Sequence, residues 1–229
     1  MKSILSGETR EVLKIIFKDR TRTNLLKNCE QKTLAFLVQR IPSWIQSDML
    51  TLFGFFGSLT VLLGFILATY VHKNFLLLGV LGFAINWFGD SLDGRLAYYR
   101  NKPRKWYGFS LDLTIDWITT ILIGLGYILY VRGYWVFAGF GFVGFYGWAM
   151  ITTLIRYKVT GKYIIDSGLL GPTEVRIIIS TILIAEVLFK DAILYSGIGA
   201  CAVLLIVNII ETLKLLNQAN DLDNAEKRK

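Results

Sequence analysis

The stretch FLLLGVLGFAINWFGDSLDGRLAY, residues 75–98, decides the fold because it is long enough to cross a bilayer as one helix. No charged side chain occurs before Asp90, whereas Asp90, Asp93 and Arg95 follow within the last nine residues. A helix rises about 1.5 Å per residue, so roughly twenty apolar residues span the hydrocarbon core. The stretch therefore predicts a transmembrane helix with carboxylates near one end.

The chain as a whole has the composition of a membrane protein. Its 229 residues are 54% hydrophobic and 14% aromatic, with a mean hydropathy of +0.50, outside the range typical of soluble domains. Five more apolar runs occur, at about residues 49–71, 109–131, 134–156, 173–190 and 192–216. We expect an all-α, polytopic bundle of six transmembrane helices, residues 43–217, between an N-terminal segment, 1–42, and a charged tail, 218–229.

The distribution of Lys and Arg predicts the orientation. With six spans, 22 of these 25 residues fall on one side, and only Lys73, Arg132 and Lys190 fall on the other. Basic links stay on the cytoplasmic side. We therefore expect both termini to be cytoplasmic, at the inner or plasma membrane if the protein is bacterial.

The first forty residues lack the uninterrupted apolar core of a signal peptide. Apolar residues instead recur at helical spacing among basic ones, for example at Val12, Leu13 and Ile16. This pattern indicates amphipathic helices lying on an anionic inner leaflet. A solvated pair of cytosolic helices is the alternative.

Several other features carry no catalytic signal. The net charge of +8 follows from the positive-inside rule, and no basic-aromatic surface suggests a nucleic-acid partner. The stretch GFGFVG, residues 139–144, lies inside an apolar run and not at a strand-to-helix turn, so it favours close helix packing over dinucleotide binding. The pairs Gly54/Gly57 and Gly79/Gly82 also predict close helix contacts.

Four aspartates are the main functional signal. Asp90 and Asp93 are three residues apart, and Asp112 and Asp116 four apart, so each pair lies on one side of its helix. The short link at 101–107 predicts that the two helices are antiparallel neighbours. Carboxylates within a span are costly, and four that converge would form a hard-oxygen site for Mg²⁺ or Mn²⁺, with two ions sharing ligands.

The alternative is that these acids cap helices or form ion pairs with nearby Arg95, Arg100, Arg104 and Lys105. Two glycines favour the metal site. Gly94 and Gly108 carry no side chain, so a bound diphosphate could approach the backbone closely there.

The segment Asp90-Ser-Leu-Asp93-Gly94-Arg-Leu-Ala97, followed by Gly108-Phe-Ser-Leu-Asp112-Leu-Thr-Ile-Asp116, resembles the signature of the CDP-alcohol phosphotransferase family. The family pattern is D-x-x-D-G-x-x-A-R, eight residues, then G-x-x-x-D-x-x-x-D. The resemblance implies a six-helix membrane enzyme of phospholipid biosynthesis, a homodimer with a cytoplasm-facing cavity. Such an enzyme transfers a substituted phosphate group from a CDP-alcohol to an acceptor hydroxyl and releases CMP.

The resemblance also assigns roles to residues. Asp90, Asp93, Asp112 and Asp116 would bind the metal ions, and Asp116 could also be the base that takes the acceptor's proton. The predicted CDP-binding residues are Asp48, Thr51, Gly94, Ala97, Arg100 and Gly108.

Three positions depart from the family pattern. Tyr98 replaces the family arginine, and the gap from Ala97 to Gly108 is one residue longer than usual. Arg100, nearly one helical turn beyond Ala97, could supply the missing charge. The upstream element P-N-x-x-T corresponds to SDMLT, residues 47–51, which keeps the Thr as Thr51 but has Ser47 and Asp48 in place of the Pro and Asn.

The second half of the chain supplies a tentative acceptor or head-group site at Arg156, Lys158, Glu174 and Arg176. Gly171-Pro172-Thr173-Glu174 resembles the choline and ethanolamine phosphotransferase branch, in which Glu174 would face an ammonium group. The same Pro172 and Thr173 are also typical of a helix start. The three cations could instead bind an anionic acceptor, with CDP-diacylglycerol as donor. Both donor classes stay open.

Two other functions remain open as well. The aspartates could form the transport site of a divalent-cation transporter or channel, with Glu186 and Asn208 as the best residues to continue a path. Alternatively, Tyr98 could mark a catalytically inactive family member.

Overall fold

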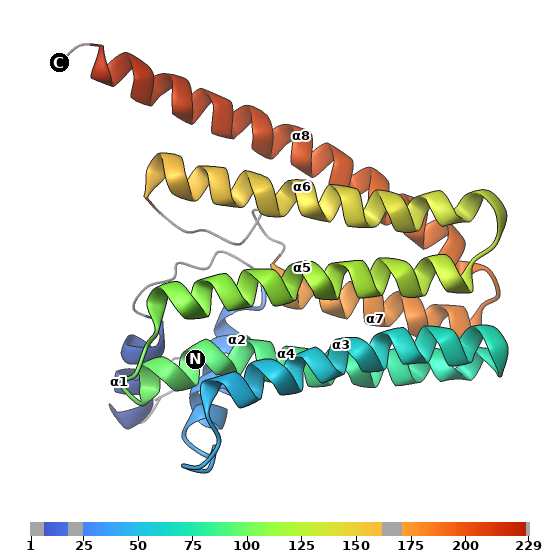
Figure 1. Ribbon diagram of the computed structural model, residues 1–229, viewed down its shortest axis with the longest axis horizontal. Helices are drawn as coiled ribbons and strands as arrows, with labels where there is room; N and C mark the ends of the chain where they lie inside the picture. The colour runs from blue at the N-terminus through green and yellow to red at the C-terminus, as the bar shows by residue number, and fades with distance from the viewer. Residues whose placement is uncertain (1–6, 18–24, 162–170, 228–229) are drawn as a thin grey trace, which may run out of the picture.

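The computed structural model describes residues 7–17, 25–161 and 171–227, and every regular element in these ranges is helical (Figure 1). This confirms the all-α prediction for the described part of the chain. Two short helices, α1 (Gly7–Ile16) and α2 (Lys27–Val38), come first. The longer helices are α3 (Ser47–Tyr70), α4 (Leu76–Tyr99), α5 (Lys105–Tyr130), α6 (Val136–Thr160), α7 (Pro172–Leu188) and α8 (Ala192–Glu226).

Five segments of the described chain are long and apolar enough to cross a membrane, as expected of a multi-pass membrane protein. They are Ser47–Tyr70, Lys73–Tyr99, Lys105–Tyr130, Gly133–Thr160 and Ala192–Glu226. The predicted span at 173–190 corresponds to α7, which has 17 residues and is therefore only about 26 Å long. The count of six spans thus stays a prediction.

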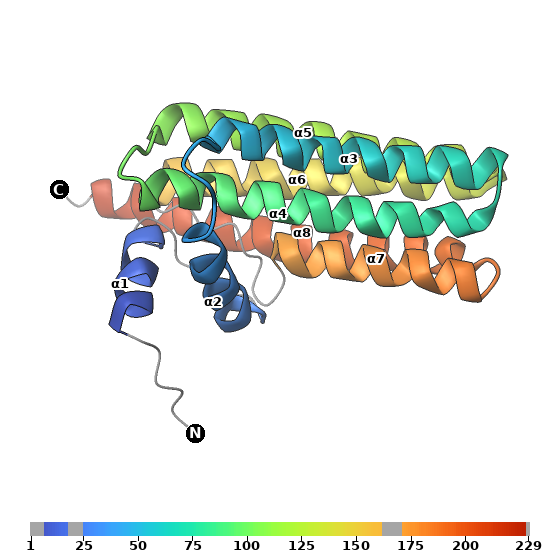
Figure 2. The ribbon, with the colours of Figure 1, turned by 90° about the horizontal axis from the view of Figure 1, so that it is seen from below.

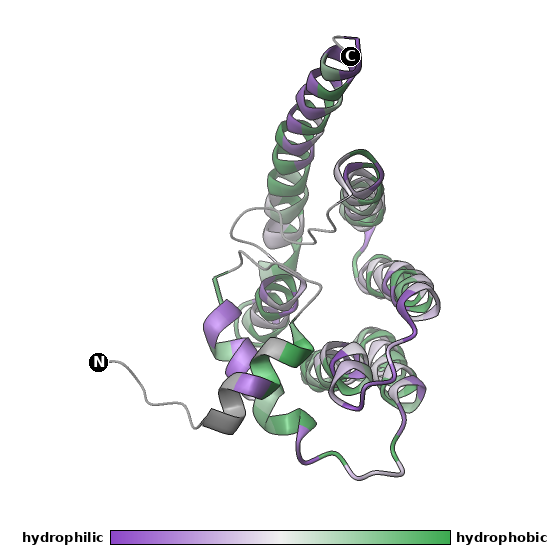
Figure 3. Cartoon of the chain, turned by 90° about the vertical axis from the view of Figure 1, so that its left-hand side faces the viewer, coloured by the Kyte–Doolittle hydropathy of each residue, from purple (hydrophilic) through white to green (hydrophobic). Residues whose placement is uncertain are grey.

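The long helices run up and down beside one another. The α3–α4, α5–α6 and α7–α8 turns lie at one end, and α1, α2 and the start of α5 lie at the other (Figures 1 and 2). The predicted boundary at residue 217 falls within α8, which continues to Glu226. Figure 3 shows hydrophilic residues along the C-terminal part of α8, which extends past the bundle.

Helices α3 and α4 pack backbone to backbone through glycines. A methyl group added at Gly57 would lie 2.6 Å from the carbonyl oxygen of Gly82, and one added at Gly89 would lie 2.5 Å from Gly54 Cα. Ordinary contacts begin near 3.4 Å, so only glycine fits at these crossings. The predicted role of the glycines in close helix contact is confirmed here. In the stretch 139–144, Gly139 packs against α5, whereas no atom lies near Gly144.

Helix α3 packs along both α4 and α5, so few backbone positions of α4 and α5 lie close together in the described chain. The predicted neighbours meet through side chains instead, since carboxylate oxygens of Asp90 on α4 and Asp112 on α5 lie within 4.8 Å of each other. The glycines of α3 draw α4 close to α3, and α4 packs on its other side against α7. The five-residue link from Arg100 to Arg104 still holds the end of α4 near the start of α5.

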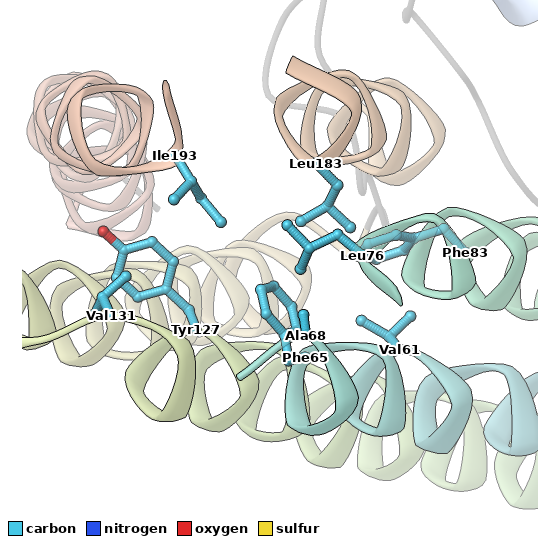
Figure 4. Close-up of a cluster of buried hydrophobic side chains, with 9 residues drawn as sticks. All are labelled: Val61, Phe65, Ala68, Leu76, Phe83, Tyr127, Val131, Leu183 and Ile193. Atoms are coloured by element: carbon cyan, nitrogen blue, oxygen red, sulfur yellow. The ribbon is translucent and has the colours of Figure 1, made fainter. Parts of the chain in front are cut away.

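Two apolar cores hold the bundle together. The first joins α3, α4, α5, α7 and α8, whose side chains point toward one another in Figure 4. Its buried members are Val61, Phe65, Ala68, Leu76, Phe83, Tyr127, Val131, Leu183 and Ile193.

The second core joins α1 and α2 to the beginning of α3 and the end of α4. It buries Ile16 and Leu34 against Leu92 and Leu96. Arg95 completes this contact, because its guanidinium donates to the carbonyl oxygen of Ile16 at 2.9 Å. The N-terminal helices therefore dock on the bundle at the end where the aspartates lie, and their position at a membrane surface stays a prediction.

Candidate functional site

Three of the four aspartates meet in space. Asp90 comes from α4, and Asp112 and Asp116 come from α5; one carboxylate oxygen from each lies within 4.8 Å of the other two. All three side chains are half-buried. The spacing of four residues along α5 puts Asp112 and Asp116 on one face, and the short α4–α5 link brings that face to Asp90.

The donor set fits a small divalent cation. Around Mg²⁺, ligand oxygens at about 2.0–2.1 Å from the ion lie about 3 Å apart when adjacent and about 4 Å apart when opposite. The three carboxylates thus need only small side-chain movements to share an ion. Three negative groups this close also repel one another, and a cation would remove that repulsion. Among the described residues, no other group of three acidic, His or Cys side chains has its ligand atoms within 4.8 Å of one another.

Asp93 is held slightly apart from this group. Thr51 Oγ1 donates to Asp93 Oδ2 at 2.6 Å, and the Gly94 N–H donates to Oδ1. Ser47 Oγ donates to the carbonyl oxygen of Asp93 at 2.5 Å. Asp93 is near enough for repulsion by Asp90 and Asp112. The structure therefore brings three predicted ligands together and ties the fourth to the start of α3.

Arg176 also reaches the cluster. Its guanidinium lies 2.6 Å from Asp90 Oδ2, and the two side chains are only 12% and 22% exposed. The sequence favours an acceptor site for Arg176 and other basic partners for the aspartates. The actual partner comes from α7, 86 residues away in sequence.

A polar network supports the cluster from the interior of the bundle. Asn86 Nδ2 donates to Gly54 O at 3.1 Å and to Ser58 Oγ at 3.0 Å, and Ser58 shares a hydrogen bond with Thr119. Asn86 Oδ1 is buried and accepts no hydrogen bond within the described chain. This network was not predicted, although polar residues within apolar runs are a usable signal.

A small cavity of about 30 Å³ adjoins these side chains. Asn86, Asp116, Tyr146 and Arg176 are among the residues that line it. Its size and polar lining suit about one water molecule. Asp116 therefore belongs both to the carboxylate cluster and to the lining of this cavity.

The predicted CDP-binding residues lie in different surroundings. No atom lies within 4 Å of the position that a methyl group would take at Gly94 or Gly108, so both border open space. Thr51 binds Asp93, Ala97 is half-buried, and the half-buried Asp48 pairs with Arg104.

Arg100 instead holds the link before α3. Its guanidinium donates to backbone carbonyl oxygens of this link, among them Pro42 O at 2.8 Å and Ile41 O at 3.3 Å. Its predicted contact with a phosphate stays a prediction, while the structure gives it a packing role.

The tentative acceptor residues are not gathered into one group. Glu174 accepts hydrogen bonds from the N–H groups of Leu26 at 2.8 Å and Gly171 at 3.0 Å, so it caps α7 and ties it to α2. This agrees with the helix-start interpretation of the segment. Arg156 pairs with Glu211 of α8 at 2.7 Å, and Lys158 is exposed.

An apolar groove runs from Arg176 between α2, α4 and α7. Its volume is about 480 Å³, and its walls include Phe83, Trp87, Ile177 and Ile184. The groove therefore joins a cation at the aspartate cluster to a surface that suits hydrocarbon chains.

No protein-family model matches the chain, and no curated protein is similar enough in sequence to count as a match.

Proposed function

We propose that the protein is a metal-dependent CDP-alcohol phosphotransferase of phospholipid synthesis in the membrane. The observation that carries this proposal is the convergence of Asp90, Asp112 and Asp116, from the two helices that bear the family-like motif. The open space beside Gly94 and Gly108 adds support, because a nucleotide diphosphate needs room next to the ligands. The proposal includes an active site on the cytoplasmic side of the membrane and a homodimeric protein.

The aspartates would hold one or two Mg²⁺ or Mn²⁺ ions. When bound, such ions neutralise the charge of a diphosphate and stabilise the departing phosphate oxygen. Asp90, Asp112 and Asp116 would be the direct ligands. Asp93, held by Thr51 and the Gly94 N–H, would join them by a small rotation of its side chain.

Asp116 is the proposed base. It would take the proton of the acceptor hydroxyl while the hydroxyl oxygen bonds to the β-phosphorus of the CDP-alcohol. The bond between that phosphorus and the oxygen bridging to CMP breaks, and CMP leaves. Asp116 suits this role because it borders both the carboxylate cluster and the polar cavity of Asn86 and Tyr146.

Arg176 and the groove behind it support a lipid substrate. The guanidinium would bind a phosphate once a metal ion takes over Asp90, and the groove would receive acyl chains. Both donor classes fit this arrangement: CDP-diacylglycerol with a polar alcohol, or CDP-choline or CDP-ethanolamine with diacylglycerol.

The transporter hypothesis has less support. Glu186 accepts hydrogen bonds from Tyr130 Oη at 3.0 Å and the Ile193 N–H at 2.9 Å, so it fastens the α7–α8 turn. Asn208 Nδ2 donates to the Phe145 carbonyl oxygen at 2.7 Å and joins α8 to α6. Packing roles thus account for both residues that were to continue an ion path.

The test is CMP release by the purified protein with Mg²⁺ or Mn²⁺. One arm offers CDP-diacylglycerol with a panel of polar alcohols, and the other offers CDP-choline or CDP-ethanolamine with diacylglycerol. We expect metal-dependent CMP in one arm and, for Asp116→Asn, a rate at least about 100-fold lower. Asp223→Asn, a change of the same kind on the exposed end of α8, should keep the full rate.

Each other outcome has a defined meaning. Normal turnover by a folded Asp116→Asn variant refutes the assigned base. Absence of CMP in both arms refutes the enzymatic proposal and favours an inactive family member, with its Tyr98. Metal-dependent ion flux in liposomes without CMP release favours a transporter.

A further inference from the structure

A second cavity lies at the opposite end of the bundle from the aspartates. The α3–α4, α5–α6 and α7–α8 turns lie at this end (Figure 1), and residues of all three line the cavity, whose volume is about 810 Å³. This is within the size range of small-molecule sites. None of the residues of the proposed catalytic site lines it.

The cavity collects the basic residues of this end of the protein. Lys73, Arg132 and Lys190 each come from a different turn, and all three line it. They are the three Lys and Arg residues that the six-span topology assigns to this side, out of 25 in the chain. None of them has a salt bridge with any residue in 7–17, 25–161 or 171–227.

The two carboxylates of the cavity cancel only part of this charge. Glu186 is buried, and the hydroxyl of Tyr130 and the Ile193 N–H already donate to its oxygens. Asp191 forms the turn into α8, where its φ is 66°. The cavity therefore has three cations and two carboxylates, and one of the carboxylates, Glu186, already accepts two hydrogen bonds.

The remaining lining is typical of a site at the depth of lipid head groups. Tyr134 and Trp135 belong to it, and Trp135 packs edge-to-face on Tyr195 with ring centroids 5.5 Å apart. Such aromatic side chains gather where the hydrocarbon meets the head groups. Ala68 and Leu194 add apolar surface beside the cations.

We propose that this cavity binds the phosphate head group of an anionic glycerophospholipid. The three cations would contact the phosphate, and the apolar wall would take the first part of an acyl chain. A free phosphate ion would contact only the three cations. The apolar surface beside them therefore favours a lipid phosphate over a free one.

The experiment measures lipid binding to the purified full-length protein by native mass spectrometry. Phosphatidylglycerol, phosphatidylcholine and inorganic phosphate are titrated separately. The test variant carries Lys73→Gln, Arg132→Gln and Lys190→Gln. The control carries Lys32→Gln, Lys102→Gln and Lys227→Gln, which remove the same charge from exposed positions outside the cavity.

The wild type and the control should retain a phosphatidylglycerol molecule that the test variant binds at least about tenfold more weakly. Equal retention by all three proteins, or equal loss in test variant and control, overturns the proposal. The lipid assignment is overturned if inorganic phosphate binds as tightly as the lipid and the triple substitution weakens that binding. If the triple variant does not fold, Arg132→Gln alone is judged by the same criteria.

Discussion

Gly89→Ala should separate α3 from α4 and thereby disturb the aspartate cluster. The added methyl carbon would lie 2.5 Å from Gly54 Cα, about 0.9 Å closer than an ordinary contact. The neighbouring atoms belong to the backbone, so no side-chain rotation relieves the clash. Overpacking costs about 1–3 kcal/mol, and alanine returns about 1 kcal/mol of helix propensity, which leaves a net loss of up to about 2 kcal/mol.

The displacement should reach the metal ligands because Asp90 directly follows Gly89. A shift of α4 by about 1 Å relative to α5 moves the Asp90 carboxylate away from Asp112 and Asp116, and metal coordination tolerates only a few tenths of an ångström. We expect the affinity for Mn²⁺ to fall about tenfold, which corresponds to about 1.4 kcal/mol.

The assay compares Gly89→Ala with Gly144→Ala on α6, where no atom lies within 4 Å of the added carbon. Unfolding is followed by tryptophan fluorescence in detergent, and Mn²⁺ binding by electron paramagnetic resonance. Gly144→Ala should match the wild type or be slightly more stable. The packing argument fails if the two variants unfold alike and bind Mn²⁺ equally well.

Three further predictions follow from single contacts. Thr51→Val removes the hydroxyl that holds Asp93, so CMP formation should slow about tenfold with little change in stability, measured by steady-state kinetics. Arg95→Met removes the bond to α1, so hydrogen exchange in α1 should accelerate while α4 stays protected. Glu211→Gln leaves the buried Arg156 without its carboxylate, so the free energy of unfolding should drop by about 3 kcal/mol in chemical denaturation; an unchanged midpoint would contradict this.

The helices could be predicted from the sequence because each apolar run is long and ends at charges or turns. The predicted runs match α3 to α8 to within a few residues at most ends, and the largest error is at the polar end of α8. The grouping of Asp90, Asp112 and Asp116 was also predictable, since helical spacing and a short link determine it.

Partners from distant parts of the chain could not be predicted. Arg176 meets Asp90 because α7 packs against α4, and nothing near Asp90 in the sequence encodes that contact. Arg100 was expected at a phosphate from its position beyond Ala97. In the structure Arg100 donates to a carbonyl oxygen of the link before α3, because that link passes beside the end of α4, and its contact with a phosphate stays a prediction.

The docking of α2 on α7 has a consequence for biogenesis. Leu26 and Glu174, which join these helices, are 148 residues apart, so the ribosome has to add the whole intervening chain before the bond can form. At about 5 to 20 residues per second, the N-terminal helices wait about 7 to 30 seconds for their partner. During that interval the core shared with α3 and α4 is the part of the bundle that can already cover their apolar faces, so the hydrogen bonds between α2 and α7 form late and complete the docking.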